Sequence, residues 1–176
     1  MDPKLLFVDR LLQLERRIGR IYQKWAAHEN FPADLRSFCK AMADDEQQHL
    51  TILERSAGLL NFASTPPASA ATRLKNVETA IAEAERFSDR PDLEIDGLLS
   101  RALALESSEL NQLDDTWLAS FQPDLGKLTQ GWAHAHEEHL HRLYDATSRF
   151  TANENLYKQA AALLSRYELE AAAHGT

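Results

Sequence analysis

Four histidines and two glutamates fall within eight residues of the stretch GWAHAHEEHLHRLYD, residues 131–145. They are His134, His136, His139, His141, Glu137 and Glu138. Imidazole and carboxylate groups are common ligands of transition metals, so this cluster could bind a metal ion. It could also be a solvated surface, or the two could occupy different faces of one helix. The helical phase of the surrounding residues distinguishes these alternatives.

The apolar residues of this segment define one face of a helix, because an α-helix turns by roughly 100° per residue. They are Leu125, Leu128, Trp132, Leu143, Ala146 and Phe150. His136 and His139 fall on this face, and we predict that both point into the core. His134, Glu138 and His141 fall on the opposite face, although Glu138-x-x-His141 looks more like a metal-binding motif. Those three residues could form a weaker surface patch for zinc or nickel.

Glutamates also interrupt the apolar faces of three other predicted helices. Glu15, Glu46 and Glu106 lie within these faces, His49 lies one turn after Glu46, and Glu109 lies at the edge of its face. Taken singly, each has an ordinary explanation, such as a hydrogen-bonded core histidine or a carboxylate paired with arginine. Several buried carboxylates together cost several kcal/mol each unless a cation compensates them. We therefore predict a shared site for a pair of divalent metal ions.

An internal repeat supports the same choice of residues. A shift of 90 residues aligns DLRSFCKAMADDEQQHLTIL with DLGKLTQGWAHAHEEHLHRL without a gap. This alignment places His49 on His139 and Glu46 on His136. The repeat thus matches Glu46-x-x-His49 with His136-x-x-His139, and not with Glu138-x-x-His141.

Long segments with a 3.6-residue period, separated by short stretches rich in glycine and proline, predict an all-α protein. We expect helices over residues 3–28, 34–60, 71–87, 93–119 and 124–150, with Asp124 capping the last of these. Residues 61–72 are expected to be a linker, and Thr151 or Asn153 to cap a final helix. Two hairpins joined by a long connection with an extra helix predict a ferritin-like four-helix bundle over residues 1–150. Residues 151–176 would add a C-terminal helix packed on the bundle.

The bulk composition excludes several classes of protein. The chain has 176 residues and a formal net charge of −8, which argues against a nucleic-acid partner. The single cysteine, Cys39, excludes an internal disulfide framework. The sequence shows neither a long apolar segment for membrane insertion nor a secretory signal. We expect a cytoplasmic protein.

The ordered set of motifs resembles the rubrerythrin branch of the ferritin-like superfamily over residues 5–150. The resemblance rests on Glu15 followed by Tyr22, on Glu46-x-x-His49, on Glu106-x-x-Glu109 and on the segment ending in His139. It implies a non-haem di-iron centre inside the bundle, with alternatives of iron with zinc, manganese, or zinc alone. It also implies reduction of peroxide with an external electron donor, and association as a homodimer. Reduction of O₂, oxidation of ferrous iron or oxygenation of a substrate is equally compatible with the residues.

The resemblance assigns a role to each residue. Glu15 and Glu106 would be terminal ligands, Glu46 would bridge, and His49 and His139 would be nitrogen ligands. Glu109 would be a mobile carboxylate. Tyr22 would hydrogen-bond a ligand carboxylate.

One position departs from the family pattern, because His136 stands where a second bridging glutamate is expected. If the helix used Glu138 and His141 instead, it would have to rotate or contain a local irregularity such as a π-bulge. The departure leaves an alternative function open: a ferritin-like binding or scaffold protein with a degenerate, mononuclear or zinc-filled site.

Overall fold

The computed structural model describes residues 3–59, 68–110 and 126–174, and these residues form six helices and no strand. The helices are α1 (Pro3–Ala26), α2 (Ala33–Leu59), α3 (Ala68–Ser88), α4 (Ile95–Leu110), α6 (Gly126–Phe150) and α7 (Glu154–His174). The predicted all-α class is therefore confirmed for the described part of the chain.

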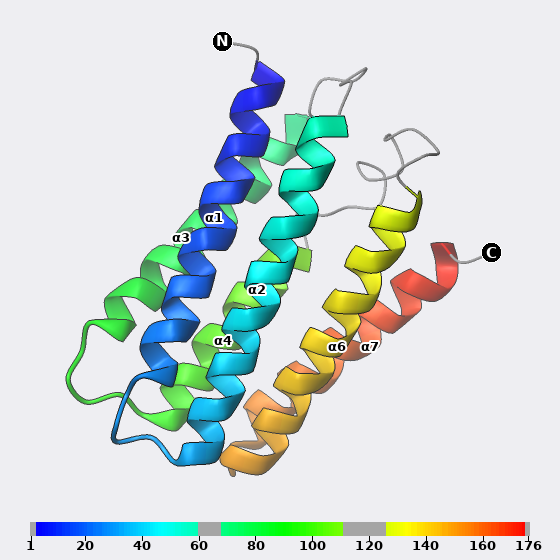
Figure 1. Cartoon of the computed structure of the whole chain (residues 1–176). Helices are drawn as coiled ribbons and strands as arrows, with labels where there is room; N and C mark the ends of the chain where they lie inside the picture. Colours follow the sequence, from blue (N-terminus) through cyan, green and yellow to red (C-terminus); the bar gives the residue numbers. More distant parts are fainter. Residues whose placement is uncertain (1–2, 60–67, 111–125, 175–176) are drawn as a thin grey trace.

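The helices pack as a bundle, with α1, α2 and α6 side by side at the front of Figure 1 and the other three behind them. α2 contacts both α1 and α6, and α4 contacts α3, α6 and α7. α3 also packs on α1, and α7 on α6. Segments far apart in the sequence, such as α2 and α6, are thereby brought together along the length of the bundle.

The interior of the bundle is apolar along most of its length, and most of the residues that interrupt it have acidic or imidazole side chains. Ile18, Tyr22 and Trp25 of α1 are fully buried, as are Leu98 and Leu99 of α4. The buried polar or charged residues are Glu15, Asp45, Glu46, His49, Glu106, His136, His139 and Thr147. The acidic and imidazole side chains thus gather in one part of an otherwise hydrocarbon core.

Several helix boundaries differ from the predictions. The predicted linker over residues 61–72 extends too far, because α3 already begins at Ala68. Three of the five residues of ASAAT, residues 68–72, are alanine, the strongest helix former, and this explains the earlier start. The predicted extension of α4 to residue 119 and the cap at Asp124 lie outside the described residues.

Asn153 rather than Thr151 caps the last helix. The Oδ1 atom of Asn153 accepts a hydrogen bond from the Asn155 backbone N–H at 3.1 Å, as an N-cap residue does. The hydroxyl of Thr151 instead accepts a hydrogen bond from the Asn153 backbone N–H at 2.9 Å. Both alternatives therefore contribute to the turn, but only Asn153 occupies the capping position.

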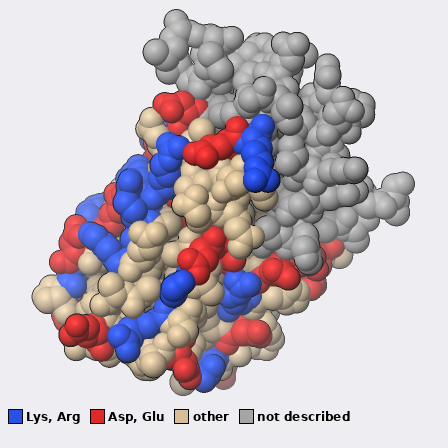
Figure 2. Space-filling model, in the orientation of Figure 1, with Lys and Arg blue, Asp and Glu red and all other residues tan. Residues whose placement is uncertain are grey.

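The outer face carries interspersed acidic and basic side chains, as Figure 2 shows for one side of the molecule. Some of them join neighbouring helices: Arg16 of α1 pairs with Glu54 of α2, and Arg17 pairs with Glu85 of α3. The exposed Arg16–Glu54 pair contributes little stability on its own. In the part of the chain that the structure describes, no helix has the length and apolar character needed to cross a membrane.

Candidate metal centre

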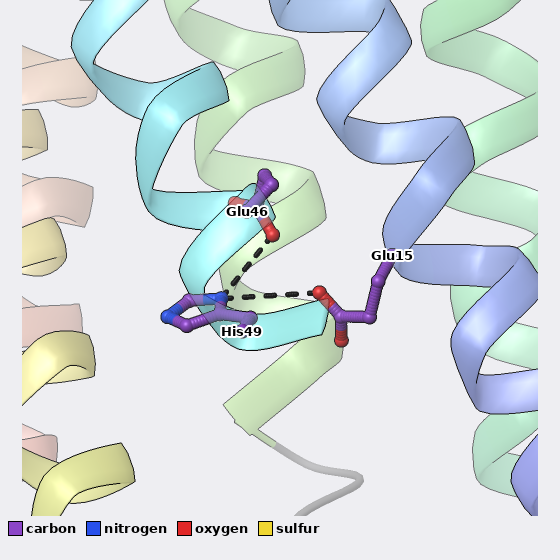
Figure 3. A group of neighbouring side chains, drawn as sticks. All are labelled: Glu15, Glu46 and His49. Carbon is purple, nitrogen blue, oxygen red and sulfur yellow. Dashed lines mark hydrogen bonds and ion pairs between the residues drawn. The ribbon is translucent and has the colours of Figure 1, made fainter. Parts of the chain in front are cut away.

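Glu15 of α1 and the Glu46-x-x-His49 motif of α2 form the first ligand group (Figure 3). The Nδ1 atom of His49 lies 3.2 Å from Glu46 Oε2 and 3.8 Å from Glu15 Oε2. Glu46 and His49 share a face of α2 because they are three residues apart. α1 comes close here, since a Cβ atom built on Gly19 would lie 3.4 Å from Glu46 Cβ.

Glu46, Glu106 of α4 and His139 of α6 form a second ligand group. The Nε2 atom of His139 lies 2.9 Å from Glu106 Oε2 and 3.5 Å from Glu46 Oε1. Glu46 therefore belongs to both groups and presents a different carboxylate oxygen to the histidine of each. In each group the three ligand atoms lie within 4.8 Å of one another.

Two further contacts orient the ligands of the second group. The Tyr22 hydroxyl donates a hydrogen bond to Glu106 Oε1 at 2.7 Å. Asp45 Oδ2 lies 3.3 Å from His139 Nδ1 and accepts a hydrogen bond from Arg142 at 2.5 Å. Sequence reasoning anticipated Tyr22 through the family resemblance but missed Asp45. Its position in the sequence could have indicated it. Asp45 lies three residues after Met42 and four residues before His49, and residues at these spacings share one side of a helix.

His136 is buried, but it belongs to neither ligand group. The centroid of the His136 ring lies 5.9 Å from the ring centroid of His49 and 5.3 Å from the ring centroid of Tyr167 on α7. Neither ring nitrogen has a hydrogen-bond partner among the described residues. A metal-ligating role for His136 stays a prediction.

The alternative motif of this helix faces outward. Glu138 and His141 are exposed, and α6 is a continuous α-helix from Gly126 to Phe150, so no local irregularity turns them inward. This corrects the alternative in which a π-bulge brings both residues to the site. The side chains of Glu109 and His134, both named in the sequence analysis, lie outside the described part of the structure.

Burial dominates the electrostatics of the first ligand group and of His136. It raises the pKa of Glu15 to about 7, an effect that Glu106 reinforces and a hydrogen bond with Glu46 opposes. Burial and the neighbouring imidazoles lower the pKa of His49 well below its usual value. Burial and the charge of His139 lower the pKa of His136 to about 4. These imidazoles are therefore neutral at pH 7 and able to donate a lone pair.

His139 and Glu106 behave as an ion pair. Burial lowers the pKa of His139, but the charges of Glu106 and Asp45 outweigh this and raise the pKa to about 9. Burial raises the pKa of Glu106, but the charge of His139 and the hydrogen bond from Tyr22 oppose this and hold the pKa below its usual value. A proton on His139 thus compensates part of the buried negative charge.

The arrangement of donor atoms fits divalent cations. Glu15 Oε2 is buried and has no hydrogen-bond partner among the described residues. Glu106 Oε2 is close to His139 Nε2, but the two atoms are not aligned as a hydrogen bond. Mixed carboxylate and imidazole ligands suit iron, manganese and zinc. Two groups that share a carboxylate could hold two such ions close together.

Comparisons of the chain with protein-family models, with curated proteins and with solved structures gave no significant match.

Proposed function

We propose that this protein is a non-haem di-iron oxidoreductase of rubrerythrin-like type. In this proposal α1, α2, α4 and α6 form a ferritin-like bundle, α3 lies in the long crossover, and α7 is an additional helix. The observation that supports it best is the position of Glu46, whose two oxygens face His49 and His139 in two different ligand groups. A carboxylate shared in this way is what a dinuclear site requires.

Each buried side chain has a role in this proposal. Glu46 would be a ligand of both ions, Glu15 and Glu106 would each hold one ion, and His49 and His139 would supply nitrogen ligands. Tyr22 holds Glu106 in position through its hydrogen bond. Trp25 and Ile18, which are fully buried on α1, belong to the apolar surroundings that keep bulk water away.

Bound iron would supply the two electrons that, with two protons, convert hydrogen peroxide to two water molecules. The single cysteine of these 176 residues, Cys39, cannot form a four-cysteine rubredoxin site, so we propose that a redox centre outside these residues returns the electrons. Reduction of O₂ and oxidation of ferrous iron would use the same ligands. Homodimer formation belongs to the proposal through the family resemblance only.

The test is metal analysis of protein purified without a histidine-affinity step, followed by peroxide consumption with the ferrous-loaded protein. We expect two iron ions per chain and peroxide turnover that depends on a supplied reductant. Less than one metal ion per chain, together with no turnover, would contradict the proposal. Glu54→Gln is a matched control, because Glu54 is an exposed residue of α2 outside both ligand groups.

The position of His136 favours a second candidate, a zinc-filled or mononuclear site in a binding or scaffold protein. Without a second glutamate at this position, Glu46 is the one carboxylate common to both ligand groups of the described residues. A single bridging carboxylate places less negative charge between two ions. Growth with equal iron and zinc distinguishes the candidates: zinc retention without peroxide turnover supports the second, and iron with turnover supports the first.

A further inference from the structure

The two ligand groups differ in how the residues around them hold their ligands. We name Glu46, Glu106 and His139 the clamped group, and Glu15, Glu46 and His49 the open group. We propose that the chain binds two divalent cations in sequence, first in the clamped group and then in the open group, and that Asp45 is the positioning residue that sets this order. This inference rests on the proposed function, because it takes both groups as metal sites.

His139 is oriented by a contact on the side of its ring that faces away from Glu106. Asp45 Oδ2 lies 3.3 Å from Nδ1, and Arg142 donates a hydrogen bond to the same oxygen at 2.5 Å. Nε2 is thereby directed toward Glu106 Oε2, 2.9 Å away. Metal-binding histidines commonly give their second ring N–H to a carboxylate, which fixes the tautomer and the ring orientation.

Glu106 is oriented in the same way by Tyr22. The tyrosine hydroxyl occupies Oε1 at 2.7 Å, so Oε2 is the oxygen that faces His139. Two ligand atoms of the clamped group are thus held close together before a cation arrives. A preorganised site loses less conformational entropy on binding, and this increases its affinity once the cation has displaced the proton of His139.

The open group lacks this preorganisation at Glu15. The distance from Glu15 Oε2 to His49 Nδ1 is 3.8 Å, and Glu15 hydrogen-bonds Glu46, which is itself a ligand, rather than a residue outside the site. A cation bound in the clamped group also uses Glu46, which the open group needs as a ligand. Its positive charge repels a second cation nearby. Both effects weaken binding in the open group and make it the second step.

The test is calorimetric titration of the chelator-treated full-length chain with Zn²⁺, which binds without redox chemistry. We expect a tighter and a weaker step. Asp45→Asn should weaken the tighter step about 10- to 100-fold, as loss of an outer partner of a metal ligand does, and change the weaker step less than about 3-fold. Glu15→Gln should remove the weaker step and leave the tighter one, which assigns each step to its group.

The chain supplies a matched control for Asp45. Asp44→Asn makes the same charge change one residue earlier, but Asp44 is exposed and pairs with Lys40 at 2.8 Å. It should alter neither step. Arg142→Gln removes the hydrogen-bond donor to Asp45 at a partly exposed residue, and it should weaken only the tighter step. Arg142→Lys should restore part of the affinity. The Arg142 variants decide the question if circular dichroism shows that Asp45→Asn does not fold.

The possible failures are distinguishable. If the unaltered chain binds two zinc ions but Asp45→Asn weakens both steps equally or neither, the sequential order is overturned and the metal site stands. The order is also overturned if Glu15→Gln removes the tighter step, or if Asp44→Asn has the same effect as Asp45→Asn. If the unaltered chain binds no zinc, both the order and the proposed function fail.

Discussion

At the scale of single residues, Glu46 links the two halves of the site through its two oxygens. It is fully buried and lies at hydrogen-bonding or ion-pair distance from histidines of two helices, α2 and α6. His139 on α6 likewise links several residues of the site, because its ring nitrogens lie at ion-pair distance from Glu46, Glu106 and Asp45. These two residues connect three of the four helices that hold the ligands.

His139 predicts how the stability of the metal-free protein depends on pH. Its pKa in the folded chain is raised from 6.5 to about 9, so the folded state holds this proton more tightly than the unfolded state. The resulting stability is fully present below pH 6.5 and is lost as the pH rises through 9. Between pH 7 and 9 we expect the free energy of unfolding of the chelator-treated protein to fall by on the order of 2 kcal/mol.

Urea denaturation at these two pH values measures the effect. His139→Gln removes the titrating group and should flatten the pH dependence over this interval. His141→Gln is the control, because His141 is an exposed histidine on the same helix and its loss should leave the dependence unchanged. A fall of equal size in the His139 variant would contradict the assignment.

The sequence predicted which side chains of the site are buried better than it predicted how they are connected. The apolar periodicity of α6 selected His136 and His139, and both are buried. It could not show that His136 lies outside both ligand groups, or that Asp45 contacts His139. Periodicity gives the direction of a side chain from its helix, whereas these contacts depend on the distance and register between two helices.

At the scale of whole elements, the turn between α6 and α7 fixes the position of the last helix. Thr151 and Asn153 both donate hydrogen bonds to Asp96, in the first turn of α4. Asn153 also caps α7, which carries Tyr167 next to His136. The turn thus connects three helices and places α7 against the side of the site.

Loss of this cap should destabilise the protein. We expect Asn153→Ala to lower the free energy of unfolding by about 1 kcal/mol, because the Asn155 backbone N–H loses its partner. Chemical denaturation measures the change. Asn155→Ala is the control, since Asn155 is exposed and its side chain is not the cap. If both variants lose the same stability, the capping assignment is wrong.

At the scale of the whole molecule, the buried site opposes the folding of the metal-free chain. The core holds Glu15, Glu46 and Glu106 within the apolar bundle, and buried charges cost several kcal/mol unless they are compensated. A metal that binds only the folded state raises the free energy of unfolding by RT ln(1 + [L]/Kd), where [L] is the free metal concentration and Kd its dissociation constant. In the proposed metal centre, stability and metal binding therefore depend on the same side chains.

Glu46→Gln should separate these two effects. The variant removes the shared negative charge, so we expect no zinc-dependent rise in the melting temperature. Without metal, we expect the variant to melt at or above the temperature of the unaltered chain, because one buried charge is gone. Differential scanning calorimetry with zinc and with chelator measures both. Glu54→Gln should retain the zinc-dependent rise, and a similar rise in Glu46→Gln would show that Glu46 binds no metal.

The sequence by itself determined the helical class and which faces of the helices are buried. Both follow from a repeat of 3.6 residues, a local property that neighbouring residues along one helix specify. It also identified Glu15, Glu46, His49, Glu106 and His139 as buried candidates for a common site.

Only the tertiary structure decided how these candidates divide. The packing of α1, α2, α4 and α6 places Glu46 in both ligand groups and Asp45 behind His139. It also leaves His136 outside both groups. The physical reason is that ligand distances between helices depend on their relative rotation and translation. Those are set by the close packing of side chains from residues far apart in the sequence.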